Sequence, residues 1–399
     1  MSAPHEPCRT PSSPPDPLSP LPWGGAPGRG LAFPYMAWAH HESARTRAPL
    51  SNSGVPNADA SCFDGLGISL DHPSRTALPT FEAAVARRLG VPPEAVIATP
   101  GASGGLAAVA LWLFGGARVA VEVPSYEQLR SLALRFAGQA LPLPRRLEHG
   151  YDCLPATLAA TLDSARDLHT PGHAFLTNTH NPSGALLRAP RLKELAAVCA
   201  ERDGALVSCD IYQEFLPAAE RAWACNAAAN GVTIGSLTKA YGLGPLRLGW
   251  VALGEALVAR HHELRDATYL MWVDPPTTTL AAGVAALERL DDLGAKAREL
   301  QLHSKPLLDR WLREESRLEA LIPSHGLVSF PRVKGVSDTH ALAQRLVRDA
   351  QVDVVPGEFF GAPGHLRVAC GLPPAELQAA LGRLSACLAQ PVAEPSSTR

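Results

Sequence analysis

The stretch that decides the fold is Ser236-Leu237-Thr238-Lys239-Ala240-Tyr241-Gly242-Leu243-Gly244-Pro245-Leu246-Arg247-Leu248-Gly249. Two apolar runs flank its loop and predict strands over 232–236 and 247–253. Lys239 therefore leaves a buried strand for a glycine-rich loop, between two hydroxyl residues and an arginine. Because a lysine taken alone is usually solvated, its function depends on what else the chain brings to the same edge of the sheet.

The chain before and after this stretch alternates short apolar runs with amphipathic segments. The apolar runs predict further strands over 95–99, 117–123, 139–143, 173–177 and 205–209. The amphipathic segments predict helices over 80–89, 103–114, 126–137, 154–164 and 188–202, and a helix from Glu255. This alternation predicts an α/β fold with a mostly parallel sheet covered by helices on both faces.

Beyond about residue 290 the pattern changes to short strands between helices. A long charged helix is expected over 292–315 and further helices over 338–349 and 374–388. Short strands are expected near 326–330, 352–355 and 366–369. This mixture predicts a smaller α+β domain, linked to the larger one by the long helix.

We divide the chain into four regions. Residues 1–34 hold ten of the 37 prolines and form a disordered Pro-rich extension. Residues 35–79 form an N-terminal arm that contributes to the small domain and to the rim of the active site. The arm includes a helix over 35–45, with Tyr35, Trp38 and Ala39 on one face, and an irregular stretch over 49–76. Residues 80–290 form the large domain, and residues 291–399 form the C-terminal small domain.

Composition narrows the class of protein. Lys+Arg 36 against Asp+Glu 38 gives a formal net charge of −2, so we expect no nucleic-acid partner and no membrane-surface partner. The eight cysteines form no CxxC pair; we expect no metal site, and buried reduced thiols of a cytoplasmic protein. The N-terminus shows no signal-peptide pattern, and the apolar stretch over 106–114 is far shorter than the ~20 residues of a membrane span.

Three more segments follow predicted strands, at the edge where open α/β sheets bind ligands. Residues 99–105, Thr-Pro-Gly-Ala-Ser-Gly-Gly, lead into a helix whose N-terminus can hold an anion. Residues 178–184 read Asn-Thr-His-Asn-Pro-Ser-Gly, and residues 210–212 read Asp-Ile-Tyr. Each has an ordinary alternative: a purely structural turn, a tight loop and an exposed loop acid, respectively. His180 alone is an ordinary loop histidine.

Together the four segments resemble the class I and II aminotransferases of the fold type I enzymes that use pyridoxal 5'-phosphate (PLP). The resemblance runs from about Pro49 to about Ala389. The interval of 29 residues from Asp210 to Lys239 and that of eight from Lys239 to Arg247 both fit the family. The resemblance implies PLP as the cofactor, bound in the large domain of residues 80–290.

The resemblance also implies a role for each cofactor-facing residue. Lys239 would form the internal aldimine with PLP and then carry protons. Asp210 would pair with the pyridine nitrogen and keep the ring an electron sink. The remaining cofactor contacts would come from Tyr212 and Asn181 on the ring 3′-oxygen, Tyr126 stacked on the ring, and Ala102, Ser103, Ser236 and Arg247 on the phosphate.

In the family an arginine clamps the substrate α-carboxylate, and Arg367 matches it in this sequence. Gly54, in Ser-Asn-Ser-Gly-Val-Pro over 51–56, matches the loop that closes over that carboxylate. Asn181 is also expected at the substrate. Two features depart from the pattern: residues 70–75 lack the usual tyrosine, for which His72 is the candidate substitute, and Ser183 stands where threonine is usual.

The resemblance implies an aminotransferase that moves an amino group between an L-amino acid and a 2-oxo acid by a ping-pong mechanism, in amino acid metabolism or biosynthesis. A PLP-dependent lyase, synthase or oxidase would use the same core residues, and a non-catalytic PLP-binding protein is a further alternative. A homodimer is expected. For substrate recognition, Arg75 and Arg265 are candidates at a distal carboxylate, and Tyr269 and Trp272 at an apolar side chain.

Overall fold

A computed structural model describes residues 34–41, 46, 48–67 and 76–390 of the chain. Apart from Pro34, the predicted extension over 1–34 lies outside the described residues. The same is true of His72 and Arg75, so their predicted roles are not tested. No helix within the described ranges has both the length and the hydropathy that crossing a membrane requires.

The larger lobe is built on a seven-stranded sheet, counted over the described residues. Its strands are β2 (Val96–Thr99), β3 (Arg118–Val123), β4 (Gln139–Pro144), β5 (Gly172–Thr177), β6 (Leu206–Cys209), β7 (Gly231–Ser236) and β8 (Gly249–Leu253). They lie in the order β2-β8-β7-β6-β5-β3-β4, and only β8 runs antiparallel to its neighbours β2 and β7. The expected α/β fold with a mostly parallel sheet is confirmed.

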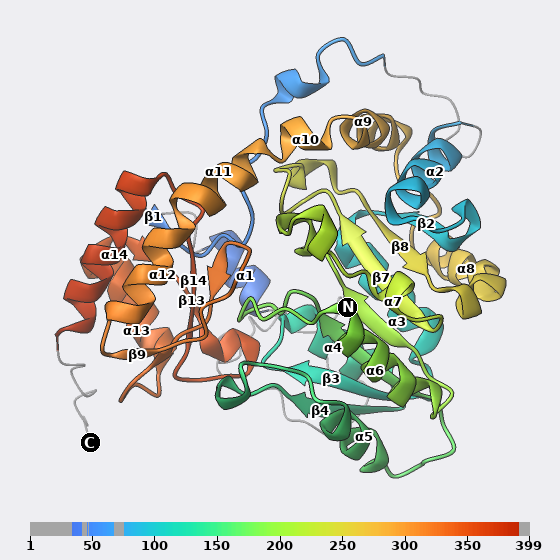
Figure 1. The fold of residues 1–399 in the computed structure, drawn as a ribbon, viewed down its shortest axis with the longest axis horizontal. Coiled ribbons are helices and arrows are strands. Elements are labelled where there is room, and N and C mark those ends of the chain that lie inside the picture. Colours follow the sequence, from blue (N-terminus) through green and yellow to red (C-terminus); the bar gives the residue numbers. More distant parts are fainter. Residues whose placement is uncertain (1–33, 42–45, 47, 68–75, 391–399) are drawn as a thin grey trace, which may run out of the picture.

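Helices cover both faces of this sheet (Figure 1). They are α3 (Gly101–Leu113), α4 (Glu127–Phe136) and α8 (His261–Met271) on one face, and α2 (Ala77–Leu89), α5 (Pro155–Asp163), α6 (Ala189–Ala200), α7 (Ala224–Ala227) and α9 (Thr277–Leu287) on the other. Because both faces are covered, the central strands are mostly apolar, and β5 and β7 are buried at every position.

The smaller lobe is drawn from orange to red in Figure 1. Its helices are α11 (Ala295–His303), α12 (Lys305–Glu314), α13 (Thr339–Arg345) and α14 (Pro374–Leu388), after the short α10 (Leu290–Leu293). Its strands are β9 (Leu318–Glu319), β10 (Val328–Ser329), β11 (Arg332–Val333), β12 (Val352–Asp353), β13 (Val355–Pro356) and β14 (Leu366–Ala369). This mixture of helices and short strands agrees with the predicted α+β texture.

The N-terminal arm lies against this smaller lobe. Strand β1 (Ala48–Pro49) pairs in parallel with β12, more than 300 residues further along the chain. Helix α1 (Pro34–His41) buries Trp38 against Phe359 and Phe360, with Tyr35 and Ala39 partly buried on the same face. The predicted face of this helix is confirmed, and the four domain boundaries stay a prediction that these contacts support.

Two predicted helices were wrong in detail. The single helix expected over 292–315 is three helices, α10 to α12, interrupted at Gly294 and Ser304. Pro306 lies in the first turn of α12, where its missing N–H costs nothing, whereas it would break the interior of a continuous helix. The helix from Glu255 begins as a 3₁₀ segment (Glu255–Arg260) before α8.

Candidate active site

Lys239 lies in the loop that follows β7. Its Nζ donates to Ser53 Oγ at 3.1 Å, and its carbonyl oxygen accepts from Val55 N at 2.9 Å. A Cβ at Gly54 would lie 3.0 Å from that same carbonyl oxygen, so the close approach of this loop requires glycine. Burial, together with the nearby Arg367 and Arg247, lowers the pKa of the Lys239 amine to about 8.

Asp210 follows β6 and is fully buried. One carboxylate oxygen accepts from Ser208 Oγ at 2.5 Å, and the other accepts from Thr233 Oγ1 at 2.7 Å and Ala224 N at 3.2 Å. Burial raises the pKa of this carboxyl to about 7, although each of the three donors acts to lower it. In the described part of the chain no cationic side chain forms an ion pair with Asp210.

Arg367, on β14, is 1% exposed. Its Nη1 donates to Asn181 Oδ1 at 3.0 Å, and its Nη2 donates to Tyr35 OH at 3.0 Å and to the carbonyl oxygen of Ser51 at 2.7 Å. Its Nε is buried without a hydrogen-bond partner among the described residues. A buried unpaired donor is costly, so this guanidinium retains binding capacity for a ligand oxygen.

The predicted phosphate site gathers at the edge shared by β2, β8 and β7. Helix α3 follows β2, and its first turn has neither a side-chain cap nor an acidic residue. A Cβ at Gly101 would lie 2.9 Å from Arg247 Nη2. Gly249 pairs with Ser236 and approaches the backbone of Gly101 and Ala102. Free N–H groups, a hydroxyl and a guanidinium therefore meet where an anion binds well.

Helix α1 packs on one side of the site, where its Tyr35 contacts Tyr126 and Arg367. Tyr126, which directly precedes α4, packs edge-to-face on Tyr35 with ring centroids 5.9 Å apart. Its hydroxyl lies 3.6 Å from Met36 Sδ. Tyr126 is thus at the rim beside Arg367, whose guanidinium lies 5.7 Å from the Tyr35 ring.

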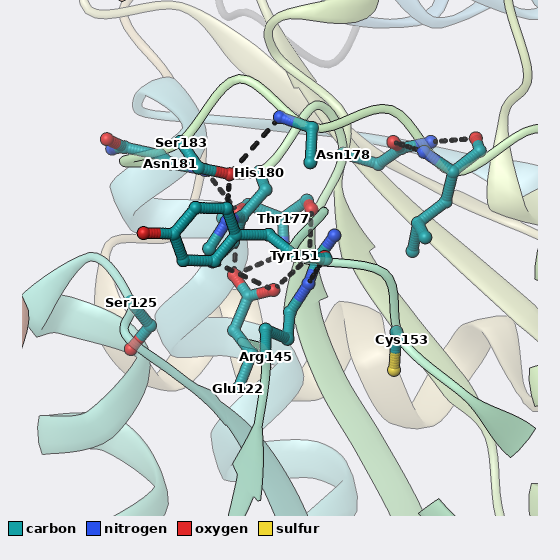
Figure 2. A network of polar contacts seen from close by, with 12 residues as sticks. Glu122, Ser125, Arg145, Tyr151, Cys153, Thr177, Asn178, His180, Asn181 and Ser183 are labelled. Carbon is teal, nitrogen blue, oxygen red and sulfur yellow. Dashed lines mark hydrogen bonds and ion pairs between the residues drawn. The ribbon is translucent and has the colours of Figure 1, made fainter. Parts of the chain in front are cut away.

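A buried polar network supports the loop that carries Asn181 (Figure 2). Glu122 accepts from Arg145 Nη1 at 2.6 Å and from the Thr177 hydroxyl at 2.6 Å, and Thr177 Oγ1 accepts from Asn181 N at 2.9 Å. His180 Nε2 lies 2.8 Å from the carbonyl oxygen of Pro124, so this nitrogen carries the proton. His180 is therefore a structural histidine and not a metal ligand.

Ser183 completes this network. Its hydroxyl lies 2.6 Å from His180 Nδ1 and accepts from Ala185 N at 3.2 Å. With Nε2 protonated, Nδ1 is the acceptor and the Ser183 hydroxyl donates to it. The departure from threonine thus keeps the hydroxyl that the loop needs.

Two weaker candidates have other partners. Arg265 forms an ion pair with Glu82 at 2.8 Å, which occupies one side of its guanidinium. Tyr269 is half exposed at 50%. Trp272 lies beside the first turn of α3, where its ring would be 3.5 Å from a Cβ at Gly104.

Sequence reasoning missed several residues that the structure brings into the site. Ser53 accepts from Lys239 Nζ and also from Tyr212 OH at 3.0 Å. Tyr35 accepts from Arg367, and Ser208 and Thr233 hold Asp210. The only available signals were the position of Ser53 next to Gly54 and the two hydroxyls inside apolar strands.

The residues present fit the PLP that the resemblance implies. A partly buried amine, a buried carboxylate without a cation and an uncapped helix N-terminus beside an arginine correspond to the aldehyde, ring nitrogen and phosphate of that molecule. Such a set of donors and acceptors suits one ligand that is anionic at one end and cationic in its ring.

Comparisons with a family model and with individual proteins indicate the same family of PLP enzymes. Residues 71–384 match the family model described as aminotransferase class I and II. The chain is 28% identical over 384 residues to capreomycidine synthase from Streptomyces vinaceus, covering 91% of this chain and 95% of that protein. It is 30% identical over 315 residues to an arginine–pyruvate transaminase from Pseudomonas aeruginosa, covering 76% and 78%.

Solved structures agree on the fold. A PLP-dependent aminotransferase from Streptococcus suis superposes with a TM-score of 0.80 at 21% identity, covering 90% of this chain and 98% of the other. A double mutant of aspartate aminotransferase from Thermus thermophilus gives a TM-score of 0.76 at 22% identity, covering 90% and 97%. At these identities the likeness is one of fold.

Proposed function

Since the chain belongs to the class I and II aminotransferases and is a PLP-dependent enzyme, we propose that it transfers an amino group between an L-amino acid and a 2-oxo acid. The transfer takes place in two half-reactions, so that donor and acceptor use the same site in turn. The homodimer stays a prediction, which light scattering tests against the 42.1 kDa of one chain. The cytoplasmic location also stays a prediction.

The observation that carries the proposal is the joint position of Lys239 and Arg367. Both contact the loop of residues 51–55, Lys239 through Ser53 and Arg367 through the carbonyl oxygen of Ser51. The Lys239 amine, whose pKa is lowered in part by Arg367, therefore lies near a guanidinium whose Nε has no hydrogen-bond partner among the described residues. That pairing suits a substrate that carries a carboxylate next to the carbon that loses or gains a proton.

The bound cofactor supplies an aldehyde that carries the amino group and a ring that withdraws electrons. Lys239, whose lowered pKa makes the neutral amine more accessible than in an ordinary lysine, takes the proton from the substrate Cα in that neutral form and returns it. Arg367 holds the α-carboxylate and fixes which bond at Cα faces Lys239. Asp210 offers its carboxylate to the ring nitrogen.

The other proposed contacts position the cofactor. Tyr212 and Asn181 would hydrogen-bond the ring 3′-oxygen, and Tyr126 would stack on the ring. The phosphate would be held by the N–H groups of Ala102 and Ser103 and by Ser236 and Arg247, while Gly54 keeps the loop close to the substrate. These assignments are supported by the shared position of the residues at one edge of the sheet.

The test is an absorbance titration of the purified protein with PLP, followed by a panel of amino acids and 2-oxo acids. We expect a cofactor band that shifts with one donor and is restored by one acceptor, with one new amino acid formed for each donor consumed. Lys239→Ala should bind PLP without the band of the wild-type protein and should form no product. A protein that gives no band at any PLP concentration contradicts the proposal.

A second candidate is a PLP-dependent synthase or lyase. It is favoured by the similarity to capreomycidine synthase, which spans 95% of that protein. In that case the same titration would release ammonia or give a cyclised product with no requirement for a 2-oxo acid. Product analysis by mass spectrometry therefore separates the two candidates.

A further inference from the structure

The loop of residues 51–55 crosses the site and is attached on both sides. On the smaller lobe, Ser51 Oγ donates to Asp353 at 2.6 Å, and the Ser51 carbonyl accepts from Arg367. On the larger lobe, Val55 N donates to the Lys239 carbonyl at 2.9 Å. Ser53 lies between these anchors, and the two that use backbone groups, the Ser51 carbonyl and Val55 N, do not depend on the Ser51 hydroxyl.

Ser53 itself is 5% exposed. Its Oγ accepts from Lys239 Nζ at 3.1 Å and from Tyr212 OH at 3.0 Å. A hydroxyl has two lone pairs and one hydrogen, so both acceptor positions are in use and the hydrogen is left over. Neither the family pattern quoted above nor the proposed mechanism uses this hydroxyl, although it touches the amine that reacts.

On the premise of the proposed function that Lys239 is the reacting amine, we propose that Ser53 is a further catalytic residue. Its hydroxyl accepts the hydrogen bond of the Lys239 amine whenever that amine is free, holds it beside Tyr212 and favours its protonated form. Ser53 thereby determines both the position of the Lys239 amine when it is free and the proton affinity of that amine.

The other groups around Lys239 explain why such an acceptor matters. Arg367 and Arg247 are cations and act to lower the pKa of the amine, as burial does. The Cys209 thiol, whose pKa burial raises to about 12, and the Tyr212 phenol, also raised to about 12, are neutral near pH 7. Ser53 is the direct hydrogen-bond acceptor of this ammonium group among the described residues, so its removal should lower the pKa further.

The experiment measures the proton affinity of Lys239 without reference to turnover. Full-length protein freed of cofactor is treated with an amine-acylating reagent between pH 6 and 10, and labelling of the Lys239 peptide is followed by mass spectrometry. In wild-type protein we expect a midpoint near pH 8. In Ser53→Ala the midpoint should fall by about one unit, which makes labelling at pH 7 about fivefold faster.

Two variants serve as controls. Ser51→Ala removes a hydroxyl from the same loop that contacts Asp353 and not Lys239, so its midpoint should equal that of wild type. Ser53→Thr keeps the hydroxyl and should restore the midpoint that Ser53→Ala loses. An unchanged midpoint in Ser53→Ala, or the same fall in Ser51→Ala, overturns the role of Ser53.

The labelling also separates this role from the proposed function. Loading the protein with PLP should protect Lys239 from the reagent, and absence of protection contradicts the proposed function. The shift between wild type and Ser53→Ala is measured in cofactor-free protein. It therefore decides the role of Ser53 whether or not protection is seen.

Discussion

Glu122 and Asp210 are both fully buried carboxylates, at the ends of two strands of one sheet, and their surroundings differ. Glu122 is neutralised inside the protein by Arg145 and also accepts from Thr177. Asp210 accepts only from two hydroxyls and one backbone N–H. Burial raises the pKa of Glu122 to about 6 against an opposing arginine, and that of Asp210 to about 7 without one.

The difference is that Glu122 is paired with a cation of the protein, whereas Asp210 has none among the described residues and can pair with a cationic ligand. A buried charge costs free energy unless it is paired. Glu122 has its cation within the chain, and its network holds the backbone of Asn181 through Thr177. Asp210 lacks a cation among the described residues, which is what a binding site for a cationic ring requires. Substitutions at the two positions should therefore have opposite effects on activity and on stability.

The largest effect is expected for Asp210→Asn. This variant keeps the size of the side chain and loses its charge, so kcat/KM for amino transfer should fall by about 10³-fold, from a lost contact worth about 4 kcal/mol. The free energy of unfolding of the cofactor-free protein should not fall, because an uncompensated buried acid is removed. Steady-state kinetics and urea denaturation measure the two quantities, and a variant that keeps a tenth of the activity would show that Asp210 is only a buried acid.

The next effect is expected for Glu122→Gln. Arg145 then stays buried without a counter-charge, which should lower the free energy of unfolding by about 3 kcal/mol, measured by urea denaturation. The value lies at the lower end for such losses because the amide oxygen still accepts from Thr177. Adding Arg145→Met should recover much of the loss. Unchanged stability in the single variant would mean that the pair carries no charge.

The sequence predicted the sheet well because strands buried on both faces are continuous apolar runs, as in Val232 to Ser236. It did not predict β9 and β11, two-residue strands that pair with each other, because an alternation of apolar and polar residues cannot be recognised over two positions. The pairing of Ala48 with Val352 also depends on the tertiary fold. The one local signal that the predicted long helix is interrupted was Pro306, which lies in the first turn of α12.

The site followed a similar rule. Lys239, Asp210 and Arg247 were candidates because their spacing along the chain resembles that of the family, and Arg367 was a candidate because its local motif does. Ser53 and Tyr35 were not, because their importance comes from contacts with residues 186 and 332 positions away. Ser53 lies among polar loop residues, and no local sequence pattern indicates that it contacts Lys239. Such residues are found only once the fold is known.

The smallest effect concerns the pH dependence of the contribution of Asp210 to stability. The folded-state pKa is raised to about 7 from an ordinary value of 3.8, so between these values the folded protein holds a proton that the unfolded chain has released. Stability of the cofactor-free wild type should therefore fall as pH rises through this window, by about 1 kcal/mol per pH unit relative to Asp210→Asn, and level off above pH 7. For Glu122, against Glu122→Gln, the corresponding fall should end near pH 6. Urea denaturation of both pairs at pH 5, 6, 7 and 8 measures these differences. A flat difference for Asp210 would mean that its carboxylate is already ionised in the folded protein over this pH range, which contradicts the raised pKa of Asp210.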